Sequence, residues 1–196
     1  MDRQHRLTTV IGVLAVLSLA WLQFDATRAA FEVLGLSNSG ALVLVMGCLA
    51  GSVIDVPIHR LRSTGTLVAV NLGGCVIPLL MCGWVVSHAR LGTDQVIAAT
   101  GLVTLASWRF SRVEPGVGVT LRGVVAPLAA LTAAAIVDAD ALAPLAYVSG
   151  TVGVLVGADL LRLRQAARGG ALALSLGGAG TRDGIFLAGV VAVLLA

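Results

Sequence analysis

The sequence predicts an all-α protein: a polytopic helical membrane protein of about seven transmembrane helices, with the last helix broken at a glycine-rich stretch. Two features of composition support this prediction. Of the 196 residues, 58% are apolar and 12% are charged, whereas a soluble domain averages about 45–50% apolar and about 25% charged residues. Long uncharged runs also recur, and about 20 apolar residues cross the hydrocarbon core of a bilayer. The length corresponds to a single transmembrane domain, residues 1–196.

The expected crossings are separated by the charged residues of the chain. The fourth is the weakest, so six crossings are the alternative to seven. The fifth contains Arg122, and the seventh contains Arg182 and Asp183. As one straight helix the seventh would be about 40 Å long, too long for the bilayer core, so we expect a break at Gly177–Gly180. The expected crossings are residues 7–24, 33–54, 63–89, 92–108, 116–137, 141–158 and 170–196.

The first run has two interpretations, because a basic start followed by an apolar stretch also describes a secretory signal peptide. Its apolar stretch, residues 7–24, is longer than the usual signal-peptide core of about 7–15 residues. Bulky residues, Trp21–Phe24, stand where a cleavage site would need small ones. We therefore interpret it as a retained transmembrane helix.

The arginines predict the orientation, since positive residues accumulate in cytoplasmic loops. Nine arginines would lie on one side of the membrane, and Arg28 and Arg90 on the other. This pattern predicts a multi-pass protein of the cell (inner) membrane with a cytoplasmic N-terminus and an outside C-terminus. Scattered arginines without interleaved aromatics do not favour nucleic-acid binding. The nine are Arg3, Arg6, Arg60, Arg62, Arg109, Arg112, Arg162, Arg164 and Arg168.

Charged residues in or beside the crossings are candidates for function, because a charge deep in a bilayer costs about 2.5–3.5 kcal/mol. For Arg122 we favour snorkelling to the cytoplasmic interface, and for Asp55 a role at a helix end or in pairing loops. Asp159 and Asp183 lie at similar predicted depth on consecutive antiparallel segments. Both segments are rich in glycine, which permits close helix approach.

The sequence therefore predicts a paired-carboxylate site, with Asp159 and Asp183 as the catalytic residues. Two neighbouring carboxyl groups share a proton, so one can activate water while the other polarises a substrate carbonyl. This chemistry needs no cofactor, and the cysteines and histidines show no metal-ligand spacing. Alternatively, Arg182 forms an ion pair with Asp159 or Asp55 that holds helices together. The expected site-lining residues are Asn71, Pro78, Gly157, Gly178, Gly180, Thr181 and Arg182.

Several motifs resemble those of a prokaryotic integral-membrane family of unknown function, over most of the chain from about residue 40. They are residues 71–78, 116–118, 143–161 and 175–189. A more distant similarity is to the Gly-x-Gly-Asp intramembrane aspartic proteases, such as presenilin, signal peptide peptidase and prepilin peptidase. In presenilin-like members one catalytic aspartate lies on an inward-running helix and the other near the start of the next helix.

Asp159, an arginine-rich loop and Asp183 follow that order here, although Thr181 and Arg182 separate the Gly-x-Gly from Asp183. The resemblance implies an intramembrane aspartyl protease whose alternating run, Ala171–Leu176, receives a membrane-embedded peptide by strand addition. The expected partners are the lipid bilayer and this peptide, and a homo-oligomer is compatible with the sequence.

Two other functions use the same residues. Broken, glycine-rich helices with polar side chains also build the sites of proton- or cation-coupled transporters. Such a pathway would add Ser149 and Thr151 to the residues already named. A non-catalytic membrane scaffold, whose buried charges specify helix packing, is the third function that the sequence leaves open.

Overall fold

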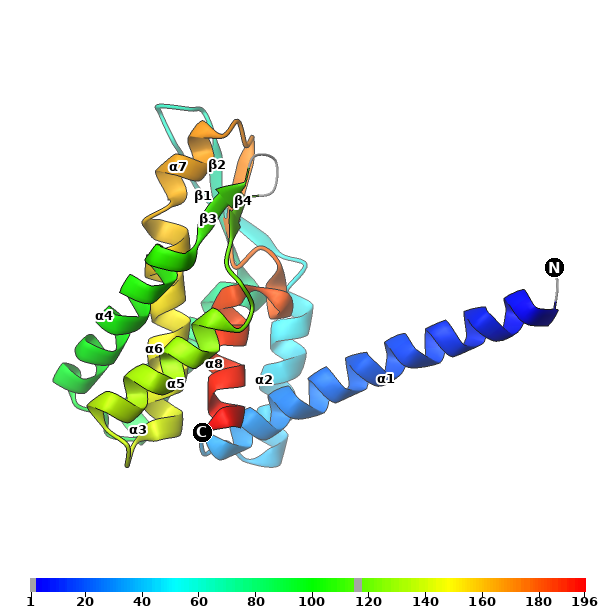
Figure 1. The fold of residues 1–196 in the computed structure, drawn as a ribbon, viewed down its shortest axis with the longest axis horizontal. Helices are drawn as coiled ribbons and strands as arrows, with labels where there is room; N and C mark the ends of the chain where they lie inside the picture. The colour runs from blue at the N-terminus through cyan, green and yellow to red at the C-terminus, as the bar shows by residue number, and fades with distance from the viewer. Residues whose placement is uncertain (1–2, 115–117) are drawn as a thin grey trace.

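The protein is mostly helical, with its strands gathered at one end of a helical bundle (Figure 1). The computed structural model describes residues 3–114 and 118–196. The amino-terminal part of α1 extends away from the bundle, and the rest of α1 packs against α2 and α8. The elements are α1 (Arg3–Val33), α2 (Asn38–Gly51), β1 (Asp55–Arg60), β2 (Leu67–Asn71), η1 (Leu72–Val76), α3 (Ile77–His88), α4 (Thr93–Phe110), β3 (Arg112–Glu114), β4 (Gly118–Thr120), α5 (Val125–Val137), α6 (Leu142–Val154), η2 (Leu155–Leu160), α7 (Leu163–Arg168), β5 (Ala173–Leu176), η3 (Gly180–Arg182) and α8 (Gly184–Leu195).

The helices fall into one long apolar unit and several shorter ones. Within the described residues, a single continuous helix, Leu142–Arg168, is long and apolar enough to cross a membrane. It comprises α6, η2 and α7. Four shorter apolar helices lie beside it, at Asn38–Gly51, Leu72–His88, Val125–Val137 and Gly184–Leu195. The helical character of the fold is confirmed, and the count of seven crossings stays a prediction.

The expectation of an all-α fold is wrong at the strand-bearing end. There β1 pairs antiparallel with β2, and β5 pairs parallel with β2, in the order β1-β2-β5. A second, two-stranded sheet joins β3 and β4. The helix expected over residues 63–89 therefore starts at Leu72, because Gly65 reverses the chain at φ +72°. The valine-rich run Leu67–Asn71 then forms the central strand.

The expected break in the last segment is confirmed. The chain first forms β5, within the run Ala171–Leu176 that alternates in the sequence. It then turns through Gly177 and Gly180, both at positive φ (+72° and +61°). The helix α8 begins at Gly184, so it has 12 residues and occupies less than half of the segment 170–196.

The centre of the bundle is α6, which packs against α3, α4, α5 and α8. Its residues from Leu145 to Thr151 are all buried. Small residues make this close packing possible: a Cβ on Gly153 would lie 2.6 Å from the Cβ of Val103 on α4, and one on Gly150 would lie 3.1 Å from the backbone of Ala188 on α8.

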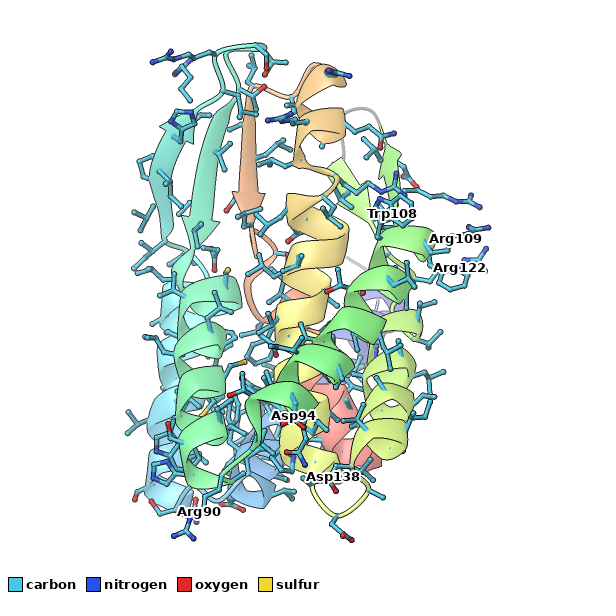
Figure 2. All side chains as sticks on the ribbon, turned by 90° about the vertical axis from the view of Figure 1, so that its left-hand side faces the viewer. Arg90, Asp94, Trp108, Arg109, Arg122 and Asp138 are labelled. Carbon is cyan, nitrogen blue, oxygen red and sulfur yellow. The ribbon has the colours of Figure 1, made fainter. Side chains whose placement is uncertain are left out.

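The charges separate toward the two ends of the bundle. Figure 2 shows Arg90 and Asp138 at the end away from the sheets, and Arg109 and Arg122 toward the sheet end. Most of the other arginines assigned to cytoplasmic loops lie on or beside β1, β3 and α7, at the strand-bearing end in Figure 1. The loops expected on one side of a membrane thus lie at one end of the molecule, and the orientation in a membrane stays a prediction.

Candidate functional site

A cavity of about 380 Å³ at the strand-bearing end contains both Asp159 and Asp183. One wall is β5, a second is β4, and the others are the helical segments that carry the two aspartates. Most of the remaining side chains are apolar. The lining residues are Gly118, Val119, Asp159, Leu163, Ala166, Ala173, Leu174, Ser175, Leu176, Gly178, Ala179 and Asp183.

Asp159 is half-buried on η2, a π-helical turn that continues α6. Such wide turns insert a residue into a helix and are frequent at functional sites. This π-helical turn packs closely against α4. Gly157 packs against the backbone of Thr104, where a Cβ would collide with the carbonyl group.

Arg162, one turn after Asp159, fixes the same segment. Its Nη2 donates to the carbonyl oxygen of Trp108 at 2.7 Å, and its Nε donates to Ser111 Oγ at 3.3 Å. The guanidinium group also lies 5.5 Å from the ring centre of Trp108. Because these contacts occupy the last carbonyl groups of α4, they join that helix end to the segment that carries Asp159.

Asp183 is the N-cap of α8 and is also half-buried. Its Oδ1 accepts from the backbone N–H of Ile185 at 3.0 Å, and its Oδ2 accepts from that of Ala179 at 3.3 Å. A carboxylate has about four lone-pair positions, so both oxygens keep acceptor capacity toward the cavity. The two backbone N–H groups therefore set the orientation of the carboxylate, and its oxygens can still accept hydrogen bonds from a group in the cavity.

Asp159 and Asp183, which lie 24 positions apart in the chain, both line this cavity. Cys75 is buried in η1 and packs against Gly177, in the turn that precedes Asp183. The structure thus brings the two predicted catalytic residues to one cavity. Their catalytic role stays a prediction.

The expected lining residues divide into three groups. Gly178 lines the cavity with the aspartates. Thr181 and Arg182 instead line a neighbouring cavity of about 560 Å³ between α1 and α2, and Ala179 separates the two cavities by lining both. Gly180 lines neither, because it packs against Ser52.

Asn71, Pro78 and Gly157 do not line the cavity, which corrects the expectation. Fully buried Asn71 accepts from the N–H of Gly74 at 2.8 Å and donates to Ser52 O at 2.9 Å, so its role is to cap the helical unit that follows β2. Pro78 is the second residue of α3 and follows η1 within the continuous helical unit Leu72–His88, where it is buried. Gly157 faces α4 for the packing reason given above.

The alternative ion pair of Arg182 with Asp159 or Asp55 is not formed. In the described part of the chain, the ion pairs join Arg28 to Asp25 and to Glu32, at 2.7 Å each. Arg182 is exposed. No group of three or more metal-ligating side chains that could hold a metal ion occurs within residues 3–114 and 118–196.

The sequence did not reveal the polar group that supports β5. Asp55 Oδ1 accepts from Ser175 Oγ at 2.5 Å and from Asn71 Nδ2 at 3.1 Å. Asp55 begins β1, so its side chain crosses β2 and ties the two outer strands of the sheet together. The boundary position of Asp55 suggested a pairing role, and its partner could not be identified before the parallel pairing of β2 with β5 was known.

Comparison with known proteins places the chain in a family without identifying an activity. No curated protein and no solved structure matches the sequence. A family profile does match, over residues 36–195, and this range contains both aspartates and every wall of the cavity. The chain therefore belongs to the family described as protein of unknown function (DUF1614).

Proposed function

We propose that the protein is a membrane-embedded aspartyl protease in which Asp159 and Asp183 form the catalytic pair. The observation that carries the proposal is their common cavity: the two aspartates line one partly apolar space that is bordered by β5, the edge strand of its sheet. In this chemistry one carboxylate takes a proton from water while the other, protonated, polarises the peptide carbonyl. Neither step uses a cofactor or a metal.

The substrate of the proposed protease is an extended peptide segment. β5 pairs with β2 along one edge, and β5 and its neighbours form a wall of the cavity. A peptide added to the unpaired edge of β5 would bond to the backbone there and would lie beside the aspartates. The apolar side chains of Val119, Leu163 and Leu174 suit an apolar, membrane-derived sequence.

A membrane location belongs to the same proposal. The long apolar helix Leu142–Arg168 would cross the membrane, and the four shorter apolar helices would pack beside it. Arginines gather at the strand-bearing end, so this end would face the cytoplasm of the cell (inner) membrane. An even distribution of arginine at both ends would have given no support for an orientation.

The test is the cleavage of membrane-derived peptides by the purified full chain in nanodiscs. Asp159→Asn and Asp183→Asn should each abolish cleavage, and Asn at position 183 can still cap α8 through its amide oxygen. Asp94→Asn is the matched control, because Asp94 is exposed at the opposite end of the bundle. Since one carboxyl group must be protonated and the other ionised, the pH–rate profile should have two limbs. Cleavage retained in either aspartate variant refutes the proposal.

A proton- or cation-coupled transporter is the second candidate, and one observation favours it. Tyr147 OH and Thr151 Oγ1, one turn apart on α6, are buried and find no hydrogen-bond partner among the described residues. Unpartnered hydroxyl groups in a core are costly and suggest a polar route toward Asp159 on the same helix. Thr151→Val should then abolish sodium- or pH-driven uptake into liposomes, whereas a protease should cleave peptides normally with this substitution.

A further inference from the structure

Arg122 and Arg182 are the two arginines that the sequence places inside predicted crossings, and the proposed chemistry gives neither a step. The structure brings them to the walls of one small cavity between the starts of α5 and α8. The cavity has a volume of about 100 Å³ and is separate from the one that contains the aspartates. Two residues that lie 60 positions apart in the chain therefore share one site.

This cavity carries an unbalanced positive charge. A guanidinium group stays protonated in proteins, and both Arg122 and Arg182 are exposed, so an anion from the surroundings can reach them. The lining residues that the structure describes include no acidic side chain. The ion pairs among the described residues are those of Arg28, so neither Arg122 nor Arg182 is neutralised within this part of the chain.

The size of the cavity restricts what can neutralise it. A water molecule occupies about 30 Å³ of the liquid, so the space holds about three waters, or one tetrahedral anionic group. A guanidinium plane offers paired donors that match phosphate oxygens. The first turns of α5 and α8 border the same space and add to its positive field.

We propose that Arg122 and Arg182 together bind a phosphate group. Its source is either a phospholipid headgroup, since the site opens at the arginine-bearing end of the bundle, or free inorganic phosphate. The bound group would hold the start of α8 against the start of α5. Because Arg182 directly precedes Asp183, the same turn would be fixed at the cavity of the aspartates.

The test is the thermal unfolding of the full chain with two probes. Inorganic phosphate is titrated against chloride at constant ionic strength, with the chain in nanodiscs of phosphatidylcholine. Phosphatidic acid is then mixed into the nanodiscs in a second series. Arg122→Gln and Arg182→Gln are compared with Arg164→Gln, which removes an exposed arginine at the same end that does not line the cavity.

The wild type and Arg164→Gln should be stabilised by one of the probes. Arg122→Gln and Arg182→Gln should each lose about tenfold to a hundredfold in apparent affinity, the value of one charge-assisted hydrogen bond. Stabilisation by inorganic phosphate identifies a free-anion site, and stabilisation by phosphatidic acid alone identifies a lipid headgroup. If a glutamine variant does not fold, Arg122→Lys, which keeps the charge and loses the paired donors, should give an intermediate affinity. Equal responses of all variants, or no response to either probe, overturn the proposal.

Discussion

Gly74→Ala should destabilise the protein, whereas Gly83→Ala in the same helical unit, Leu72–His88, should stabilise it. A Cβ on Gly74 would lie 2.8 Å from the carbonyl oxygen of Gly180 and 2.9 Å from its Cα, and closer still to the carbonyl oxygen of Gly177. These neighbours are backbone atoms of the turn that leads to Asp183, so they cannot rotate away. A Cβ on Gly83 would meet nothing within 4 Å.

The magnitudes follow from these two environments. Overpacking of this kind costs about 1–3 kcal/mol, while alanine in place of glycine on an open helical surface gains about 0.5–1 kcal/mol. The two variants should therefore differ by about 1.5–4 kcal/mol in stability, which at about 2–4 °C per kcal/mol for a chain of this length separates their unfolding temperatures by about 3–16 °C.

The assay is thermal unfolding of both variants in the same detergent, followed by circular dichroism. The comparison removes the general effect of replacing glycine in a helix, because both positions share it. Equal changes in unfolding temperature for Gly74→Ala and Gly83→Ala would refute the close contact between the start of the helical unit Leu72–His88 and the turn before Asp183.

Three further substitutions test the contacts that hold the site in place. Asn71→Ala should lower the free energy of unfolding by about 1–3 kcal/mol, because it removes the acceptor of the buried Gly74 N–H. A loss clearly below about 1 kcal/mol in denaturant titration contradicts the capping role. Arg162→Ala should lower the free energy of unfolding by about 1–3 kcal/mol, because the hydrogen bond to the Trp108 carbonyl is lost. Arg162→Lys should restore less than half of this loss, since lysine lacks the paired donors. Full recovery by lysine would show that charge alone matters. Asp138→Ala should speed hydrogen exchange at the amides of Asp140 and Ala141, just before α6, because both donate to Asp138 Oδ1, whose partner oxygen Oδ2 accepts from a side-chain amide of α4 at 2.6 Å. Unchanged exchange at these two amides would show that the Asp138 side chain is dispensable for this turn.

The parts of the fold that the sequence predicts are those set by local composition. Charges delimit the apolar runs, and the glycines of residues 177–180 mark the break in the last one. The alternation of residues 171–176 indicates an extended segment, and β5 lies within it. Each of these signals depends on neighbouring residues, so it is readable without knowing the fold.

The strands at residues 55–71 could not be predicted in the same way. Leu67–Val70 is a continuous apolar run, which does not distinguish a buried strand from the start of a helix. Its partners are β1 and a segment near the end of the chain, and pairing between such distant segments leaves no local signal. The misassignment of Asn71 to the site has the same origin, because a buried polar residue beside glycines is compatible with a ligand site and with a helix cap.

The position of β5 in the sheet has a consequence for synthesis. Residue 67 pairs with residue 173, and chains emerge from the ribosome in order. The central strand β2 must therefore remain without one neighbour while the helical units between residues 72 and 168 are made. The wall beside the aspartates is among the last parts of the molecule to assemble, so a protein truncated before residue 173 would retain most of its helices but would lack β5 and this wall of the cavity.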